Sequence, residues 1–368
     1  MTNFKSYLGY RIKKSLFPTF TFSLIALVIS VFSARVSAER FMGARGSMGI
    51  ETLATIVGII ASIIPMLELS EFKSRRNLDT LFFLPISRKS IALAHYFSGL
   101  LEMFIIYTSA FTAHFISLLE FAEDFLLEYM PLYYVLLLIL GVVVYSVFMF
   151  LFGEANSNVD GVICSILWIF ALWTAMSALA YPIRVFAMYY VYGGVSPSLE
   201  YFNFTRHLSN FAAWLMPYAP LNNLTVVFQS VMQGWNHFNG HELYFPTFAE
   251  AVGRYFPHWY MFFPWLAAGA ASIWGYFRTF TRKGAERAED VSGSLFCYKT
   301  LIPIYGASLA ILTSESDIVM FFLTVAAMYI GYAIYRRSFR IKKSDVITVV
   351  SVPVGSLAFL ILMNIVLH

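Results

Sequence analysis

Long apolar runs alternate along the chain with short charged segments, and most of these runs could cross a membrane as helices. A helix needs about twenty apolar residues to span roughly 30 Å of hydrocarbon. We predict nine spans, at residues 15–34, 49–69, 91–119, 131–152, 161–181, 256–277, 301–313, 318–335 and 346–367. The seventh is the shortest and needs the residues before it to complete the crossing.

The composition agrees with this pattern. Of the 368 residues, 59% are hydrophobic, 18% aromatic and 12% charged, whereas soluble domains carry about 25% charged residues. We therefore predict an all-α polytopic integral membrane protein, and nucleic-acid binding has no support. The two cysteines, Cys164 and Cys297, lie in or beside apolar segments, so the sequence indicates neither a disulfide framework nor a thiolate metal site.

The first fourteen residues mix apolar and basic side chains, as does a helix lying in the headgroup region. We expect this segment to lead into the first span as an elbow. A cleaved signal peptide is the alternative, because a basic start, an apolar run and the tripeptide Val36-Ser37-Ala38 imitate one. The apolar run is long for a signal peptide and many spans follow, which favours a retained first span.

The longest region without an apolar span is 182–255. It is rich in Tyr, Phe and Trp and is interrupted by prolines, a pattern that favours interfacial or re-entrant helices over a free aqueous domain. On this reading, residues 1–288 form a six-span core and residues 289–368 add about three further spans.

The distribution of Lys and Arg predicts the orientation of the chain. If the N-terminus is inside, eighteen of the twenty-five basic residues fall in inside segments, at 1–14, 70–90, 278–287 and 336–343. Six fall on the other side, and Lys299 lies at a span edge. Because basic residues are enriched in cytoplasmic loops, we predict a cytoplasmic N-terminus and an outer location for 182–255.

The most distinctive charged interruption is the stretch from Ser70 to Ser90. Read as one helix, it places Glu71, Arg75 and Asp79 at successive i, i+4 positions. Apolar side chains fall on a different face, at Leu78, Leu81 and Phe82. The pattern predicts a short amphipathic helix on the cytoplasmic side.

The end of this helix is also predicted. Leu84-Pro85 should stop it, because proline constrains the residue before it and lacks the backbone N–H that a helix interior needs. Ser87 is suited to cap the helix of the third span.

Few residues indicate chemistry. The chain lacks the Gly-rich loop and Lys that bind nucleotide triphosphates, and it lacks zinc-protease and serine-hydrolase motifs. His237 and His241, with Glu242 beside them, would suit a metal only on a helix, and the intervening Phe-Asn-Gly favours a loop. We therefore predict no metal site and no catalytic site on this chain.

One carboxylate lies well inside a predicted span. An ionisable group at membrane depth is costly and usually faces a bundle interior or a water-filled path. Glu102 is therefore either a proton relay or substrate contact, or a protonated packing contact. Glu51 and Glu68 lie at span ends, where we expect water or headgroups to reach them.

The segment EFKSRRNLDTLFFLPISR, residues 71–88, follows two spans and resembles the permease subunits of ABC-2 type exporters. There, too, an acidic residue, a basic pair and a leucine-rich turn precede Leu-Pro-Ile-Ser-Arg. The short loop GEANSNVD, residues 153–160, and the exit RKGAERAE, residues 282–289, are similar to those of the family. The chain departs from the family layout by adding about three spans after residue 290.

The resemblance implies that residues 70–84 are a coupling helix that docks on a separate ATP-binding subunit. The residues it assigns to this contact are Glu71, Arg75, Arg76, Leu78, Asp79, Leu81 and Phe82. ATP and Mg²⁺ would be bound by partner ATPase subunits, with no cofactor on this chain. A second permease chain, identical or related, would complete an exporter of an amphipathic lipid, peptide or drug in the plasma membrane.

Two alternatives remain open. A proton-coupled secondary transporter would use Glu102 and would need no ATPase partner. A membrane-embedded sensor or assembly subunit would use the cytoplasmic helix only to bind a regulator.

Overall fold

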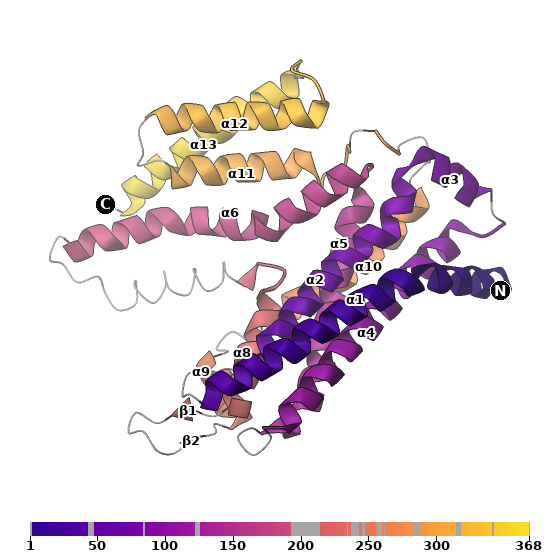
Figure 1. The fold of residues 1–368 in the computed structure, drawn as a ribbon. Coiled ribbons are helices and arrows are strands. Elements are labelled where there is room, and N and C mark those ends of the chain that lie inside the picture. Colours follow the sequence, from indigo (N-terminus) through magenta and orange to yellow (C-terminus); the bar gives the residue numbers. More distant parts are fainter. Residues whose placement is uncertain are drawn as a thin grey trace. The chain divides into compact units, whose positions relative to one another are not determined.

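In the computed structural model, helix dominates the residues that the structure describes (Figure 1). These are residues 2–42, 48–83, 85–121, 126–192, 214–233, 235–236, 243–244, 247–255, 260, 262–282, 288–290, 292–313, 318–340 and 342–367.

The chain divides into two compact units, and each unit combines two separate stretches of sequence. Unit 1 contains Met1–Gly153 and Tyr218–Ala288, and unit 2 contains Glu154–Pro217 and Glu289–His368. A unit boundary falls after residue 288, where we expected the six-span core to end. The predicted fifth span, residues 161–181, belongs to unit 2.

Unit 1 contains most of the described helices. They are α1 (Thr2–Met42), α2 (Ile50–Ser70), α3 (Arg75–Phe82), α4 (Arg88–Leu119), α5 (Met130–Glu154), α8 (Ala219–Gln233), α9 (Phe248–Tyr255) and α10 (Phe262–Arg282). Two 3-10 turns, Glu71–Lys73 and Leu127–Tyr129, precede α3 and α5. A two-residue antiparallel pair joins β1 (Trp235–Asn236) to β2 (Leu243–Tyr244), with Trp235 opposite Tyr244.

Close helix packing holds unit 1 together. The N-terminal helix α1 packs along α4, and α2 lies against α4 and α8. A methyl group added at Gly99 of α4 would collide with the hydroxyl of Tyr145 of α5. A methyl group added at Gly141 of α5 would lie 2.7 Å from Val57 of α2. Small residues at these positions permit the close approach that is common between membrane helices.

The described residues of unit 2 form four helices: α6 (Asn158–Tyr192), α11 (Tyr298–Leu312), α12 (Ile318–Arg336) and α13 (Lys343–Leu367). Helix α11 packs against the other three (Figure 1). Its core residue Leu301 is buried together with Met328 of α12 and Val349 of α13. Arg336 and Asp345 join α12 to α13 through two hydrogen bonds of 2.9 and 3.1 Å.

The two cysteines form a disulfide that links α6 to the residue before α11, across 133 positions of sequence. Our expectation that they lack a disulfide was therefore wrong. The bond lies among other links between these segments, because the Tyr298 hydroxyl donates to Asp160 at 2.9 Å and the Trp168 indole donates to the carbonyl of Phe296 at 2.7 Å.

Seven helices among the described residues are long and apolar enough to cross a membrane. They match seven of the nine predicted spans and confirm an all-helical, multi-pass membrane protein. The predicted sixth span corresponds to α10, a 21-residue helix whose Gly, Trp, Tyr and Arg content keeps it outside that group. The predicted seventh corresponds to α11, which is apolar but only 15 residues long.

The N-terminal segment runs directly into the first span. Residues 2–42 form one uninterrupted helix, α1, so the basic start and the first span are not separated by a break. Pro18 lies inside this helix, and Figure 1 shows α1 changing direction toward its N-terminal end. Prolines are tolerated in membrane helices when neighbours satisfy the freed backbone groups.

Candidate functional site

The segments of unit 1 that we predict to be cytoplasmic lie together at one end. Tyr7 of α1 packs with Ile91 and Ala94 of α4 in one buried cluster. Phe72 and Phe280 meet edge to face beside it, with ring centroids 4.8 Å apart. We call this the basic end, and it comprises residues 4–14, 68–95, 152–153, 278–282 and 288.

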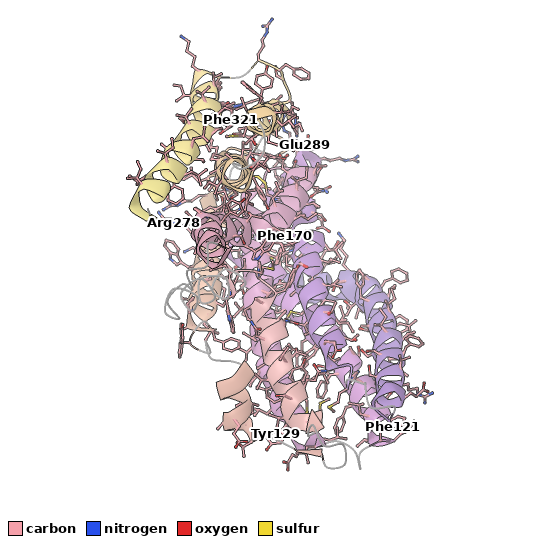
Figure 2. All side chains as sticks on the ribbon, turned by 90° about the vertical axis from the view of Figure 1, so that its left-hand side faces the viewer. Phe121, Tyr129, Phe170, Arg278, Glu289 and Phe321 are labelled. Atoms are coloured by element: carbon pink, nitrogen blue, oxygen red, sulfur yellow. A yellow bond between two sulfur atoms is a disulfide. The ribbon has the colours of Figure 1, made fainter. Side chains whose placement is uncertain are left out.

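The opposite end collects the segments predicted to lie outside. Arg35 and Glu120 approach to 3.6 Å, and His114 bonds to the carbonyl of Met48 at 3.1 Å. Figure 2 shows Phe121 and Tyr129 at this end and Arg278 toward the other. The charged segments thus separate to two ends, as they do in a bundle that crosses a membrane. Which end faces the cytoplasm stays a prediction.

The predicted single helix from Glu71 is in fact two elements. A 3-10 turn covers Glu71–Lys73, Ser74 is extended with φ −109° and ψ 128°, and α3 begins only at Arg75. The predicted stripe of Glu71, Arg75 and Asp79 on one helix is therefore wrong. The other end is as predicted: α3 stops at Phe82, and Ser87 caps α4 by accepting the backbone N–H of Ser90 at 3.2 Å.

Two basic side chains hold the base of α3. The ammonium of Lys73 is buried and donates to the carbonyls of Phe152 and Gly153, at 2.7 and 3.4 Å. These carbonyls end α5, where a helix leaves acceptors unpaired and favours a cation. Arg75 donates from Nε to the carbonyl of Ala288 at 2.9 Å, which ties α3 to the segment after α10.

The exposed surface of α3 includes only part of the predicted contact residues. Leu78 is only 6% exposed and packs inside the unit. Arg75, Arg76 and Asn77 are exposed, and so is Phe83, with 87% of its surface free. Phe83 was not among the predicted contact residues, although an apolar side chain in a charged segment was the available signal. The side chains of Asp79, Leu81 and Phe82 lie outside the described structure.

Glu71 points back into the unit instead of toward a partner. It accepts a hydrogen bond from Arg11 at 2.8 Å and pairs with Lys14, both on α1. Its exposed fraction is 25%. Glu71 therefore fastens α1 to the turn before α3.

Behind Glu71 lies an enclosed polar cluster, which we name the α1–α4 polar cluster. Arg11 donates to Glu68 at 2.7 Å, and His95 Nδ1 lies 2.6 Å from the same carboxylate. The Tyr7 hydroxyl lies 3.0 Å from His95 Nε2. Glu68 is 2% exposed, so our expectation that water or headgroups reach it was wrong. Arg11, which covers Glu68, is 57 positions away in the sequence, so only the folded structure shows this contact.

Glu102 extends this cluster toward the middle of α4. It is 6% exposed, and its carboxyl group lies beside Glu68 and the hydroxyl of Ser15. Its Oε1 atom is fully enclosed and has no hydrogen-bond partner. The buried polar position of Glu102 fits a proton relay or substrate contact, and it fits a packing contact equally well.

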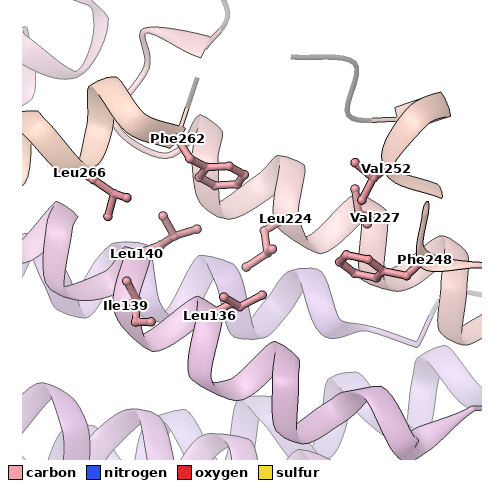
Figure 3. Close-up of a pocket in the computed structure, with 9 residues that line it drawn as sticks. All are labelled: Leu136, Ile139, Leu140, Leu224, Val227, Phe248, Val252, Phe262 and Leu266. Carbon is pink, nitrogen blue, oxygen red and sulfur yellow. The ribbon is translucent and has the colours of Figure 1, made fainter. Parts of the chain in front are cut away.

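A second feature of unit 1 is an apolar pocket of about 360 Å³ between α5, α8, α9 and α10. Figure 3 shows side chains from all four helices converging on it, and its lining is wholly apolar: Leu136, Ile139, Leu140, Leu224, Val227, Phe248, Val252, Phe262 and Leu266. Such a pocket accepts hydrocarbon and offers nothing to a charged group.

Among the residues that the structure describes, no three His, Cys, Asp or Glu side chains are grouped so that they could hold an ion. The His237 and His241 pair lies outside the described residues.

No family model matches the chain, and no curated protein matches it.

Proposed function

We propose that the chain is the membrane-spanning permease subunit of an ATP-driven exporter of the ABC-2 type. One observation carries the proposal: α3 is a short helix fixed at its base by Lys73 and Arg75 and exposed at Arg76 and Asn77, and Phe83, directly after it, is exposed too. A helix that is fixed at its base and open on its outer side suits docking on another subunit.

The contacts at the base would carry force into the bundle. A push on α3 would reach the end of α5 through Lys73 and the segment after α10 through Arg75. Glu71, in the preceding turn, would pass it to α1. Packed helices transmit such displacements as rigid elements, which is how domain motions open and close transport paths.

The energy would come from other chains. Because this sequence lacks the nucleotide-binding loop, ATP and Mg²⁺ would be held by two partner ATPase subunits. A second permease chain would complete the complex in the plasma membrane. The wholly apolar pocket supports an amphipathic cargo, such as a lipid, peptide or drug, over an ion.

The test targets Phe83, with Phe339 as a matched control. Both are aromatic and largely exposed, at 87% and 81%, and both lie in segments that we predict to be cytoplasmic. The protein would be expressed in its native cells and purified through a tag on the permease, and mass spectrometry would identify any ATPase subunit that co-purifies. We expect Phe83→Asp to lose ATPase co-purification and Phe339→Asp to keep it.

Two outcomes would count against the proposal. One is that no ATPase co-purifies with the wild-type protein. The other is that Phe83→Asp retains both the ATPase and its substrate-stimulated hydrolysis. A loss of both in Phe339→Asp as well would indicate general misfolding and contradict a specific role for α3.

A further inference from the structure

We propose that the α1–α4 polar cluster is an intramembrane proton site, in which one exchangeable proton is held on the carboxyl group of Glu102. This inference is independent of the proposed function, because it concerns the state of a buried cluster and not its partner subunits.

The first step is the charge balance of the cluster. Helix α1 contributes two cations, Arg11 and Lys14, and the α2 side contributes two anions, Glu68 and Glu71. These four charges balance. Glu102 adds a fifth charged group, and an ionised carboxylate there would leave one buried negative charge without a counter-ion.

Both terminal nitrogens of Arg11 are already engaged, although its buried Nε has no partner. Arg11 gives one terminal nitrogen to Glu68, at 2.7 Å, and the other to Glu71, at 2.8 Å. Lys14 pairs with Glu71. An ionised carboxylate that is buried and unpaired costs several kilocalories per mole, so the group neutralises itself instead.

His95 is the other place where a proton could sit, but its contacts favour the neutral ring. A neutral imidazole donates from one nitrogen and accepts at the other. Nδ1 faces the carboxylate of Glu68 at 2.6 Å, where it donates, and Nε2 faces the Tyr7 hydroxyl at 3.0 Å, where it accepts. A second ring proton would turn Nε2 into a donor and leave the Tyr7 hydroxyl hydrogen without the acceptor that it has in His95, so we place the proton on Glu102.

The remaining neighbours supply no charge. Tyr96 and Tyr276 lie near the cluster from α4 and α10, with their hydroxyls bonded to Ser146 and the carbonyl of Ala92. Tyr145 from α5 donates to the carbonyl of Tyr96 at 3.0 Å. One turn before Glu102, the enclosed Oγ of Ser98 also lacks a partner. The site is thus closed, polar and short of one positive charge.

Ionisation of Glu102 would therefore disturb the contact between α1 and α4. The new carboxylate would compete with Glu68 for Arg11, which is the main polar link from α1 to the rest of the cluster. Release of one proton would thus weaken the seam along which these two helices pack.

Dicyclohexylcarbodiimide provides the test, because it attaches to protonated carboxyl groups in apolar surroundings. The full-length protein would be reconstituted in phosphatidylcholine vesicles, treated at neutral and alkaline pH, and mapped by peptide mass spectrometry. We expect labelling of Glu102 at neutral pH and its loss at alkaline pH, with Glu68 and Glu71 unlabelled. Glu102→Gln should abolish the label, and Glu51→Gln, an exposed glutamate at the other end, should not.

Infrared difference spectroscopy covers the case in which the reagent fails to enter. Between neutral and alkaline pH, the wild-type protein should lose a carbonyl band of a protonated carboxylic acid, and Glu102→Gln should lack that band. Absence of both label and band would overturn the proposal. Protection from the label by sodium at constant pH would identify a sodium site instead.

Discussion

Arg11 Nη2 and Glu68 Oε2 lie 2.7 Å apart, and the two side chains are only 5% and 2% exposed. They join the first and second long helices at the basic end of unit 1. A buried pair of this kind adds little net stability over apolar packing. Removal of one member, however, leaves the other charge buried without a counter-ion.

Replacement of Arg11 should therefore be severe. We expect Arg11→Met to lower stability by about 3–5 kcal/mol, because Glu68 would stay buried without its cation. Thermal unfolding of the purified protein in detergent measures the loss. Lys14→Met is the control, since Lys14 is 48% exposed and should cost at most about 1 kcal/mol. Equal losses in the two variants would contradict a special role for the buried pair.

The spans and the boundaries of α3 show how much was predictable. Seven of nine spans follow from apolar runs, because hydrocarbon thickness sets their length locally. The Ser87 cap is local too. The break at Ser74 and the burial of Glu68 were not predicted, since both depend on partners on other helices, at Phe152 and Arg11.

Pairings across long stretches of sequence were the other failure. Nothing local in the chain links Cys164 to Cys297, or places the fifth span with the last three. Such groupings depend on which helix faces fit each other, and a pattern of apolar residues alone leaves several fits open.

Lys73 should be needed for the end of α5. In Lys73→Met, the carbonyls of Phe152 and Gly153 lose their buried donor, which costs about 1–3 kcal/mol. Hydrogen exchange should accelerate in the last turn of α5 and in the Glu71–Lys73 turn. Lys89→Met, at an exposed position, is the matched control and should leave both rates unchanged.

The glycines of α4 and α1 offer a paired test of packing. Gly99→Ala would push the Tyr145 hydroxyl off the carbonyl of Tyr96, and we expect a loss of about 1–3 kcal/mol. Gly9→Ala has open space around it and should gain up to about 1 kcal/mol from helix propensity. Thermal unfolding compares the two, and a stabilised Gly99→Ala would refute the close contact.

The disulfide predicts a simple chemical result. Without a reductant, iodoacetamide should modify neither Cys164 nor Cys297 in the unfolded protein, and both should react after reduction. Intact-mass spectrometry counts the added groups. Two modifications before reduction would show that the bond is absent in the isolated protein.

The orientation can be tested with single cysteines in a variant lacking Cys164 and Cys297. A membrane-impermeant maleimide applied to intact cells should label Glu120→Cys at once, and Asn77→Cys only after permeabilisation. Both positions are exposed and lie at opposite ends of unit 1. The reverse pattern would place the N-terminus and α3 outside and would remove the basis for docking on a cytoplasmic ATPase.

The two links that hold the base of α3 end on backbone oxygens, those of Phe152 and Ala288, and not on side chains. Substitutions at residues 152 and 288 thus leave both acceptors in place. A one-residue insertion or deletion near either position would rotate the acceptor away while leaving all the named side chains intact. The hydrogen bonds that hold the base of α3 should therefore tolerate substitutions at residues 152 and 288 but not insertions or deletions near them.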